Sequence, residues 1–384
     1  MTKIKYKYNI KDMTKKPIQL DVIIVYSGTI AHSANNRKYS EKKPFSAFGR
    51  HYAYNKSYQY LLQKCQNTNL KAAFCTSDDI VGPGLFSSYW TYRNKWIRHQ
   101  HPAQSRLLFD KFTPTNLTQT NQFELLTSCK SIYTFNNRKL TQLFQNKLNT
   151  YLFFKEFSIP TVEISHPSKK HIAEAKTKLD NLIQKHKHKI DFKHGYISKD
   201  TKGVGGFKIY KVNFDKPGIE NLIKQYKIDK NNKELLSYVL QPFIDCRHHL
   251  KKTEHKGLID FRLILVNKTI VQTYIRIAQK GNFKCNEHQG GNLIYLPLNI
   301  IPQDILTMTK KITNQLHQEI NIENSIYALD FIRSNHNGNL YFIEGNNNPG
   351  LDWDQTKTIN QNKSKQLIDI IVNKLFSIKQ TIAN

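Results

Sequence analysis

Two apolar segments near the end of the chain, residues 325–334 (SIYALDFIRS) and 340–346 (LYFIEGN), constrain the fold most strongly. Each has the length and the β-branched and aromatic content of a buried strand. The linking sequence NHNGN contains Asn337-Gly338, a pair that favours a tight turn between antiparallel strands. The two segments therefore predict a hairpin, which brings Asp330 of the first strand close to Glu344 of the second.

Asp330, Glu344 and Asn346 are the candidate metal ligands of this hairpin. Asn346 follows Glu344 by two positions, so both side chains lie on one face of an extended strand. Magnesium prefers hard oxygen ligands, and an aspartate inside an apolar strand is costly unless a partner compensates its charge. The alternative is that Asp330 pairs with a lysine and that the asparagines only shape a turn.

Short strand-like and helical segments alternate along the rest of the chain. Residues 20–26, 54–66 and 71–77 read as strand, helix and strand, an order typical of an α/β unit with parallel strands. Later segments predict a largely antiparallel α+β region, with strands at 194–199, 207–212, 238–244, 260–267 and 269–278 and helices at 137–157, 166–188, 218–226, 302–320 and 358–382. We therefore predict an α+β fold with an α/β N-terminal domain, divided into domains at 1–135, 136–212 and 213–384.

A glycine-rich segment, ISKDTKGVGGFKI, lies between two of these strands and is a candidate phosphate site. Glycines let backbone N–H groups approach a phosphate closely, and Lys199 precedes Gly203, Gly205 and Gly206. The segment is neither a Walker A loop nor a dinucleotide fingerprint, because a strand follows the glycines. A plain flexible hairpin is the alternative. Lys147, on the preceding helix, is a second candidate cation.

Arginines mark a third candidate region. Asp260 and Arg262 lie on one face of the strand in GLIDFRLILVN, and Arg276 lies in the neighbouring strand, upstream of Lys284 and Asn286. Arginine holds carboxylate or phosphate groups through paired hydrogen bonds. A surface salt bridge of Asp260 with Arg262 or another neighbour is the alternative.

The chain is strongly basic, with 58 Lys and Arg against 29 Asp and Glu and a net charge of +29. Such a charge attracts nucleotides, nucleic acids or acidic peptides, although the abundance of Lys, Asn and Ile leaves a composition bias as the alternative. The sequence has no finger, basic-zipper or aromatic-interleaved basic pattern, so nucleic acid is not predicted as the main partner.

The sequence shows no signal that would predict a membrane segment or secretion. No apolar segment approaches the roughly 18–20 residues that cross a bilayer, and the first residues lack the apolar core of a signal peptide. The five cysteines are scattered and form no CxxC pair. We therefore expect a cytoplasmic protein without a membrane partner; its oligomeric state is left open.

Taken in order, these separate motifs resemble the ATP-grasp superfamily, most closely the group of RimK and glutathione synthetase. The resemblance covers about residues 147–352 and rests on Lys147, KDTKGVGG, VLQPFID, DFRLILV, YIRIAQKGNFKCNEHQGG, ALDFI and IEGNNNPG. It implies the ATP-grasp fold, in which two α+β lobes hold the nucleotide between them.

The resemblance also implies roles for individual residues. Lys147 and Lys199 would contact phosphates, and residues 203–206 would cover them. Arg276 and Arg262 would steady the transferred phosphoryl group or an acyl phosphate. Magnesium (one or two ions, with manganese as an alternative) would be held by Asp330, Glu344 and Asn346. The remaining nucleotide contacts implied are Gln241, Phe243 and Ile244 near adenine, Asp260 near ribose, and Lys284 and Asn286 near the phosphates.

The implied activity is an ATP-dependent carboxylate–amine ligase that makes an amide bond through an acyl phosphate. The basic charge fits an acidic peptide or protein as acceptor. A small-molecule peptide synthetase and a non-catalytic ATP-binding regulatory protein are the alternatives. Two positions depart from the family pattern: Asp200 stands where a proline often follows the second lysine, and Pro242 stands where a hinge residue is often acidic.

Overall fold

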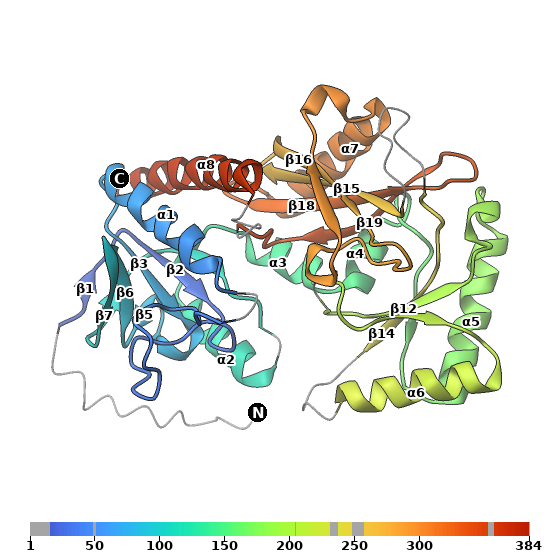
Figure 1. The fold of residues 1–384 in the computed structure, drawn as a ribbon, viewed down its shortest axis with the longest axis horizontal. Coiled ribbons are helices and arrows are strands. Elements are labelled where there is room, and N and C mark those ends of the chain that lie inside the picture. The colour runs from blue at the N-terminus through green and yellow to red at the C-terminus, as the bar shows by residue number, and fades with distance from the viewer. Residues whose placement is uncertain are drawn as a thin grey trace. The chain divides into compact units, whose positions relative to one another are not determined.

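The computed structural model describes residues 16–48, 51–114, 116–203, 205–230, 237–247, 257–351 and 357–383. These residues form two compact units (Figure 1). Unit 1 combines the described parts of Met1–Asn136 and Gly350–Asn384, and unit 2 is formed from Asn137–Pro349. A division of residues 136–384 into two domains at residue 212 stays a prediction.

Unit 1 is built on a six-stranded sheet in the order β10-β9-β2-β3-β6-β7. Its strands β2 and β3 pair in parallel and are connected through α1, which confirms the predicted strand–helix–strand unit. A smaller sheet has the order β1-β8-β5-β4. The elements are β1 (Ile18–Gln19), β2 (Val22–Tyr26), α1 (Tyr54–Asn67), β3 (Ala72–Thr76), β4 (Ile80–Gly82), β5 (Leu85–Phe86), β6 (Tyr89–Arg93), β7 (Lys95–His99), β8 (Ala103–Gln104), β9 (Leu107–Lys111), α2 (Leu117–Leu126) and β10 (Tyr133–Thr134).

The last helix of the chain, α8 (Thr358–Ala383), belongs to unit 1. It packs against α1, where the Tyr60 hydroxyl donates to Asp369 at 3.0 Å and the Lys64 ammonium lies 3.2 Å from the same carboxylate. Its inner side buries apolar residues such as Ile371 and Leu375. The predicted helix at 358–382 is therefore confirmed, and it completes the unit in which the chain begins.

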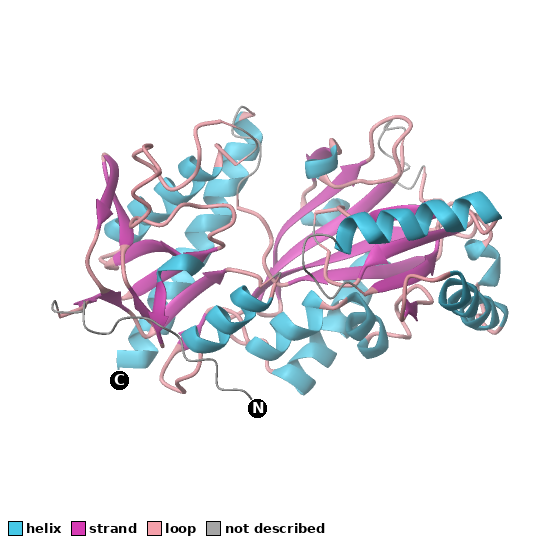
Figure 2. Ribbon diagram, turned by 90° about the horizontal axis from the view of Figure 1, so that it is seen from below, coloured by secondary structure: helices cyan, strands magenta, loops and turns pink. Residues whose placement is uncertain are grey.

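Unit 2 contains two sheets of four and five strands, drawn in magenta in Figure 2. The four-stranded sheet, in the order β11-β14-β12-β13, shares a core with α5 and α6. Its elements are β11 (Val162–Ile164), α5 (Lys169–Gln184), β12 (Tyr196–Asp200), β13 (Ile209–Val212), α6 (Lys216–Lys230) and β14 (Tyr238–Pro242).

The five-stranded sheet has the order β17-β16-β15-β18-β19 and shares a core with α3, α4 and α7. Its paired strands are antiparallel, so both predicted hairpins of this region are confirmed. The elements are α3 (Arg138–Gln145), α4 (Lys147–Phe153), β15 (Ile259–Val266), β16 (Thr269–Ile277), β17 (Asn292–Tyr295), α7 (Gln303–Ile320), β18 (Ile326–Arg333) and β19 (Leu340–Asn346).

The prediction of one continuous helix at 137–157 is wrong, because the helix breaks at Asn146. This residue has extended backbone angles, and its Oδ1 accepts hydrogen bonds from the N–H groups of Leu148 and Asn149. An asparagine side chain that caps free N–H groups starts a new helix. The break makes Lys147 the first residue of α4.

Candidate active site

The five-stranded sheet has one apolar face and one charged face. Phe261, Leu263 and Leu329 pack into the core beneath α7. Successive side chains of a strand point to opposite faces, so Asp260, Arg262 and Asp330 lie on the face away from that core. The sequence prediction that Asp260 and Arg262 share a face is thus confirmed.

These three side chains and Arg276 form one buried network. Arg262 lies directly across from Asp330, and its Nε and Nη2 donate to the two carboxylate oxygens at 2.7 and 2.5 Å. Arg276 lies across from Asp260 and donates to its two oxygens at 2.7 and 2.8 Å. Arg276 also donates to Asp330 at 2.7 Å, which joins the two pairs.

This network tests the alternative interpretations that the sequence left open for Asp330 and Asp260. Asp330 is completely buried and is paired with two arginines, so the alternative of a lysine partner is wrong. Asp260 pairs with Arg276, and at 5% exposure this is not a surface bridge. Burial by itself raises the pKa of the Asp330 carboxyl, but Arg262 and Arg276 outweigh it and lower the pKa to about 2. Asp330 is therefore a carboxylate at neutral pH.

Glu344 and Asn346 extend the charged face at the end of β19. Glu344 lies across from Asp330, and its carboxylate is 3.7 Å from Arg262. The intervening Gly345 points the other way, where an added Cβ would lie 2.3 Å from the ring of Phe144. Glu344 and Asn346 therefore share the face predicted for them. The Asn346 Oδ1 accepts from the N–H of Asn348 at 2.9 Å.

The four-stranded sheet contributes a second polar face. Tyr238 and Leu240 of β14 point into the core with α5, so Gln241 points away from it. Lys199 on β12 lies across from Val239, on the same side as Gln241. Gln241 is buried and its Nε2 donates to Thr161 at 2.7 Å, but its Oε1 has no hydrogen-bond partner among the described residues.

The polar faces of the two sheets lie close together, because carboxylates of the five-stranded sheet act electrostatically on Lys199 of the four-stranded sheet. Burial lowers the pKa of Lys199 to about 8, Glu344 opposes that shift, and the nearby Lys147 adds to it. Asp260 and Asp330 also act on this lysine. Lys199 of the four-stranded sheet therefore lies near Lys147 of α4 and near carboxylates of the five-stranded sheet.

The glycine-rich loop lies against the phosphate-site residues predicted for it. The Lys147 ammonium donates to the carbonyl of Gly203, and its backbone N–H donates to Thr201 at 2.9 Å. Gly205 and Gly206 have positive φ angles of 66° and 77°. An added Cβ on Gly206 would lie 2.7 Å from Oδ1 of Asn286, so the loop touches the segment after β16. Val204 lies outside the described residues.

The residues predicted to lie near adenine, Phe243 and Ile244, differ in what they offer to a ligand. Ile244 packs its side chain into the core with α5, so only its backbone is available to a ligand. Phe243 and Phe283 have ring centroids 6.2 Å apart, and the Lys211 ammonium lies 4.7 and 5.2 Å from them. Burial lowers the pKa of Lys284, whose ammonium lies 5.9 Å from the Phe283 ring.

Sequence reasoning missed several residues of this region. Tyr274 is fully buried and lies across from Arg262, a pairing that depends on the register shift between Ile264 and Leu265. Lys211 and Phe283 gave no signal, because a lysine on a short strand and a phenylalanine in a loop are ordinary.

The oxygen donors present suit a hard divalent cation. Asp330, Glu344 and Asn346 bring carboxylate and amide oxygens to one face, as magnesium requires. No group of three or more His, Cys, Asp and Glu side chains suited to a metal occurs among the described residues, so the amide oxygen of Asn346 is needed to complete a set of three. The orphaned Oε1 of Gln241 similarly suits a donor such as an amino group of a base.

Comparison with known proteins identifies the fold. A family model described as RimK-like ATP-grasp domain matches residues 147–371. No curated protein matches the sequence. Similar solved structures include D-alanyl-alanine synthetase A from Vibrio cholerae, with 12% identity, a TM-score of 0.56, and coverage of 94% of this chain and 99% of that chain.

Two further solved structures are similar. A RimK domain protein from Sphaerobacter thermophilus has 8% identity and a TM-score of 0.52, with coverage of 91% of this chain and 98% of that chain. The ATP-grasp ligase PsnB, complexed with a minimal precursor, Mg and ADP, has 8% identity and a TM-score of 0.51, with coverage of 94% and 99%. The predicted ATP-grasp fold of α+β type is confirmed. No helix among the described residues is long and apolar enough to cross a membrane.

Proposed function

The chain belongs to the RimK-like ATP-grasp family and is an ATP-dependent carboxylate–amine ligase, and from this premise we propose that it works through an acyl phosphate. A substrate carboxylate oxygen attacks the γ-phosphorus of ATP, the bond to the bridging oxygen breaks, and ADP leaves. The nitrogen of an amine then attacks the acyl carbon. The bond from that carbon to the phosphate oxygen breaks, the nitrogen loses a proton, and the products are an amide and phosphate.

The observation that carries this proposal is the concentration of buried charge between the two sheets of unit 2. Such a reaction needs no nucleophilic side chain from the protein, only positioning and stabilisation of phosphoryl charge. Arg262 and Arg276 are rigid cations, because both are held by buried carboxylates. Lys199 faces the same region and is coupled to Glu344.

We assign the nucleotide contacts as follows. Lys147 and Lys199 hold phosphates, and a bound phosphate replaces the Gly203 carbonyl as the partner of Lys147. Gln241 and the backbone near Phe243 and Ile244 contact the base. The other proposed contacts are the loop glycines 203, 205 and 206 with Lys284 and Asn286 at the phosphates, and Asp260 at the ribose.

Magnesium is the proposed metal, with Asp330, Glu344 and Asn346 as its ligands. When bound, it offsets the negative charge of the phosphate oxygens. Asp330 accepts three hydrogen bonds from arginine, which leaves about one of the roughly four lone-pair sites of its carboxylate that could hold the ion. Arg262 and Arg276 keep Asp330 ionised and fix its orientation.

A mutational assay of magnesium–ATP turnover tests these ligands. We expect Glu344→Gln to lower turnover strongly, because the substitution removes the negative charge of the carboxylate. The same substitution at the exposed Glu323 serves as a matched control. Asp330→Asn is expected to lower turnover as well, with folding checked by circular dichroism because it also weakens the arginine network. Undiminished turnover in either variant removes that residue from the set of ligands.

We propose an acidic peptide or protein as the acceptor, because the net charge of +29 favours anionic partners. The similar PsnB structure holds a precursor. A small-molecule peptide synthetase is the second candidate, and it is favoured by the likeness to D-alanyl-alanine synthetase A. Incubation with ATP, magnesium and pooled amino acids or acidic peptides, followed by mass spectrometry, separates the two through the mass of the product. Nucleotide binding without release of ADP would instead support the non-catalytic alternative.

A further inference from the structure

Unit 2 has a cleft at the turn end of the β18–β19 hairpin, away from Glu344. Its volume is about 720 Å³, and it is lined by the segment before β11, the segment after α5, the first turns of α7 and the start of β19. Clefts of roughly 300–1,000 Å³ are typical of small-molecule sites. Leu340 lines the cleft, whereas Glu344 lies four residues further along the strand, or roughly 13 Å at the usual rise of a strand.

Four cationic or protonatable side chains line this cleft, namely Lys187, Lys311, His186 and His188. Neither lysine has a carboxylate partner among the described residues. A lysine without a partner is ordinary on a surface, but two such lysines and two imidazoles at one concavity attract an anion.

Of the carboxylates near the cleft, one is paired with an arginine, and one is stabilised in its charged form by hydrogen bonds from neutral groups. Asp304 lies 2.6 Å from Arg333. Asp191, behind the wall, accepts hydrogen bonds from Ser334, Asn339 and Tyr341 at 2.7–2.8 Å. Glu156 is the one other carboxylate in the lining, and Lys187 and Lys311 outnumber it there.

Part of the cleft wall is aromatic. Phe157 and Tyr341 line it, and the His186 ring lies 4.9 Å from Phe192. The His186 Nδ1 accepts the N–H of His188 at 3.1 Å, so a neutral ring carries its proton on Nε2 and can donate it to a ligand. Burial, followed by His188 and Lys187, lowers the pKa of His186.

We propose that this cleft is a second ligand site for a small organic anion, a phosphate or carboxylate group carried on an aromatic or apolar body. Lys187 and Lys311 bind the anionic group, and Phe157 and Tyr341 contact the body. The site is distinct from the nucleotide site proposed above, because none of its lining residues belongs to the charged faces that bear Lys199, Arg262 and Glu344.

A titration monitored by the imidazole signals of isotope-labelled histidine tests this proposal on the full chain without ATP. The probes are inorganic phosphate and phenyl phosphate, and the signals of His186 and His188 are assigned through His186→Gln and His188→Gln. We expect both signals to shift saturably, and phenyl phosphate to bind more tightly than inorganic phosphate because it adds contacts with the aromatic wall.

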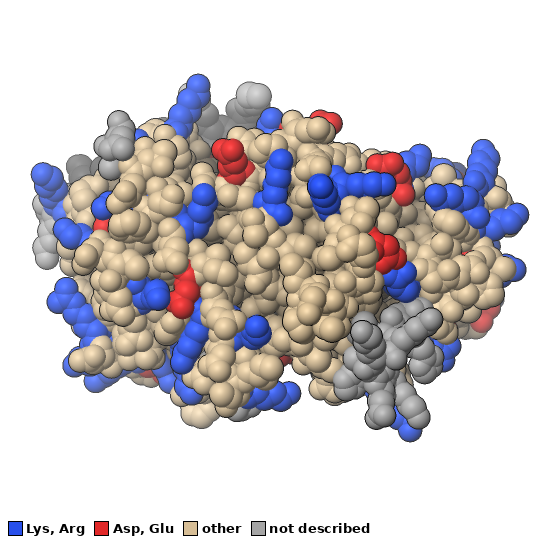
Figure 3. All heavy atoms as spheres, turned by 90° about the horizontal axis from the view of Figure 1, so that it is seen from above, with Lys and Arg blue, Asp and Glu red and all other residues tan. Residues whose placement is uncertain are grey.

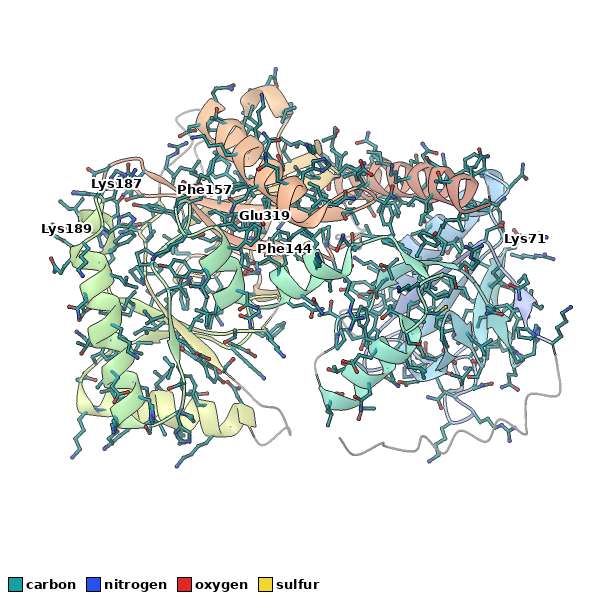
Figure 4. The ribbon with its side chains drawn as sticks, turned by 180° about the vertical axis from the view of Figure 1, so that it is seen from behind. Lys71, Phe144, Phe157, Lys187, Lys189 and Glu319 are labelled. Atoms are coloured by element: carbon teal, nitrogen blue, oxygen red, sulfur yellow. The ribbon has the colours of Figure 1, made fainter. Side chains whose placement is uncertain are left out.

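Lysine variants show whether the cleft itself holds the anion. Figure 4 labels Phe157 and Lys187 of the cleft and also Lys189, an exposed lysine that does not line it. Lys187→Ala and Lys311→Ala are each expected to weaken binding about threefold, as the loss of one exposed ion pair does. The matched control Lys189→Ala is expected to leave binding unchanged.

Two results overturn the proposal. One is the absence of saturable shifts at both histidines with either probe. The other is a Lys189→Ala variant that weakens binding as much as Lys187→Ala, because the anion would then respond only to the general charge. Since the titration contains no ATP and measures no ligation, a negative result leaves the proposed ligase function untouched, and a failed ligase assay leaves this site untouched.

Discussion

Lys199 is a proposed phosphate contact, so its ionisation would affect nucleotide binding directly. Burial lowers its pKa to about 8 in the free protein, and a bound phosphate would raise that pKa by favouring the charged form. Binding therefore requires proton uptake above pH 8, and we expect the KM for ATP to rise about fivefold between pH 8 and pH 9. Steady-state kinetics over pH 6.5–9.5 measure this effect.

Lys199→Arg is the matched control for this titration, since a guanidinium stays charged across the whole range. Its KM should be flatter between pH 8 and pH 9 than that of the wild type. Equal slopes for the two proteins would show that another group titrates.

Asp260 and Arg276 test how the buried network contributes to stability. Removing one partner of a buried ion pair leaves an uncompensated charge, so we expect Asp260→Ala to lower the free energy of unfolding by about 3 kcal/mol. Urea denaturation measures the change. The double variant Asp260→Ala/Arg276→Met should recover part of the loss, because Asp330 keeps Arg262 as its partner. A double variant as unstable as the sum of the two single variants would contradict this account.

Two register shifts explain why the sequence revealed the charged residues but not their pairing. The turn pairs Val266 with Thr269, and an unbroken ladder would put Arg276 opposite Ile259, on the apolar face. The shift between Ile264 and Leu265 puts Arg276 opposite Asp260 instead. Bulges move side chains to the other face. Alternation within one strand was predictable, but a bulge depends on contacts between strands.

The hairpin of β18 and β19 contains a similar shift. Between Asp330 and Phe331 the register changes by one residue, so that Asp330 faces Glu344 rather than Ile343. The sequence predicted that two carboxylates lie on neighbouring strands. It could not predict that they lie directly across from each other, because the tight turn alone gives a different register.

At the scale of elements, the position of the glycine-rich loop depends on the close approach of Gly206 to Asn286. Gly206→Ala places a Cβ 2.7 Å from Asn286 at a positive φ of 77°. We expect the KM for ATP to rise several-fold, because the loop must move away from the segment that contains Asn286. The matched control is Gly195→Ala, which has φ of 96° but no atom within 4 Å of the added Cβ.

Both glycine variants carry the backbone cost of about 1 kcal/mol for a positive φ. A comparison of their ATP kinetics therefore separates the contact with Asn286 from simple strain. If Gly195→Ala raises the KM for ATP as much as Gly206→Ala, the contact is not responsible.

The elements themselves were predictable where their pattern was long and regular. The long strands β15, β16, β18 and β19 matched their apolar segments closely. Residues 78–122 contain strands of only two to five residues, too short for a clear periodic signal. The break at Asn146 was missed because the apolar spacing continues across it, while the capping hydrogen bonds that start the second helix depend on a side chain.

At the scale of the whole molecule, α8 is expected to stabilise unit 1. Leu375→Ala removes a fully buried side chain, so we expect a loss of about 2–4 kcal/mol. Hydrogen exchange should then rise in β2 and β3 but not in β15 and β18, which belong to unit 2. Ile359→Ala, on the same helix but 57% exposed, is the control and should change neither. Equal loss of protection in both units would contradict an assignment of α8 to unit 1.

The net charge is a property of the surface as a whole. Figure 3 shows Lys and Arg side chains spread over the visible face with few Asp and Glu side chains among them. If this field attracts an acidic acceptor, the KM for that acceptor should rise as salt increases from about 0.05 to 0.5 M, because screening shortens the range of the attraction. A KM that is flat over this range would favour a composition bias as the origin of the charge.

The assignment of both ends of the chain to unit 1 has a consequence for biosynthesis. The chain leaves unit 1 after Asn136 and returns to it at Gly350, so all of unit 2 is translated before α8 exists. At about 5–20 residues per second this interval is roughly 10–40 s. During that time the nascent N-terminal sheet lacks the helix that covers α1. We therefore expect unit 2 to finish folding before unit 1 reaches its native packing.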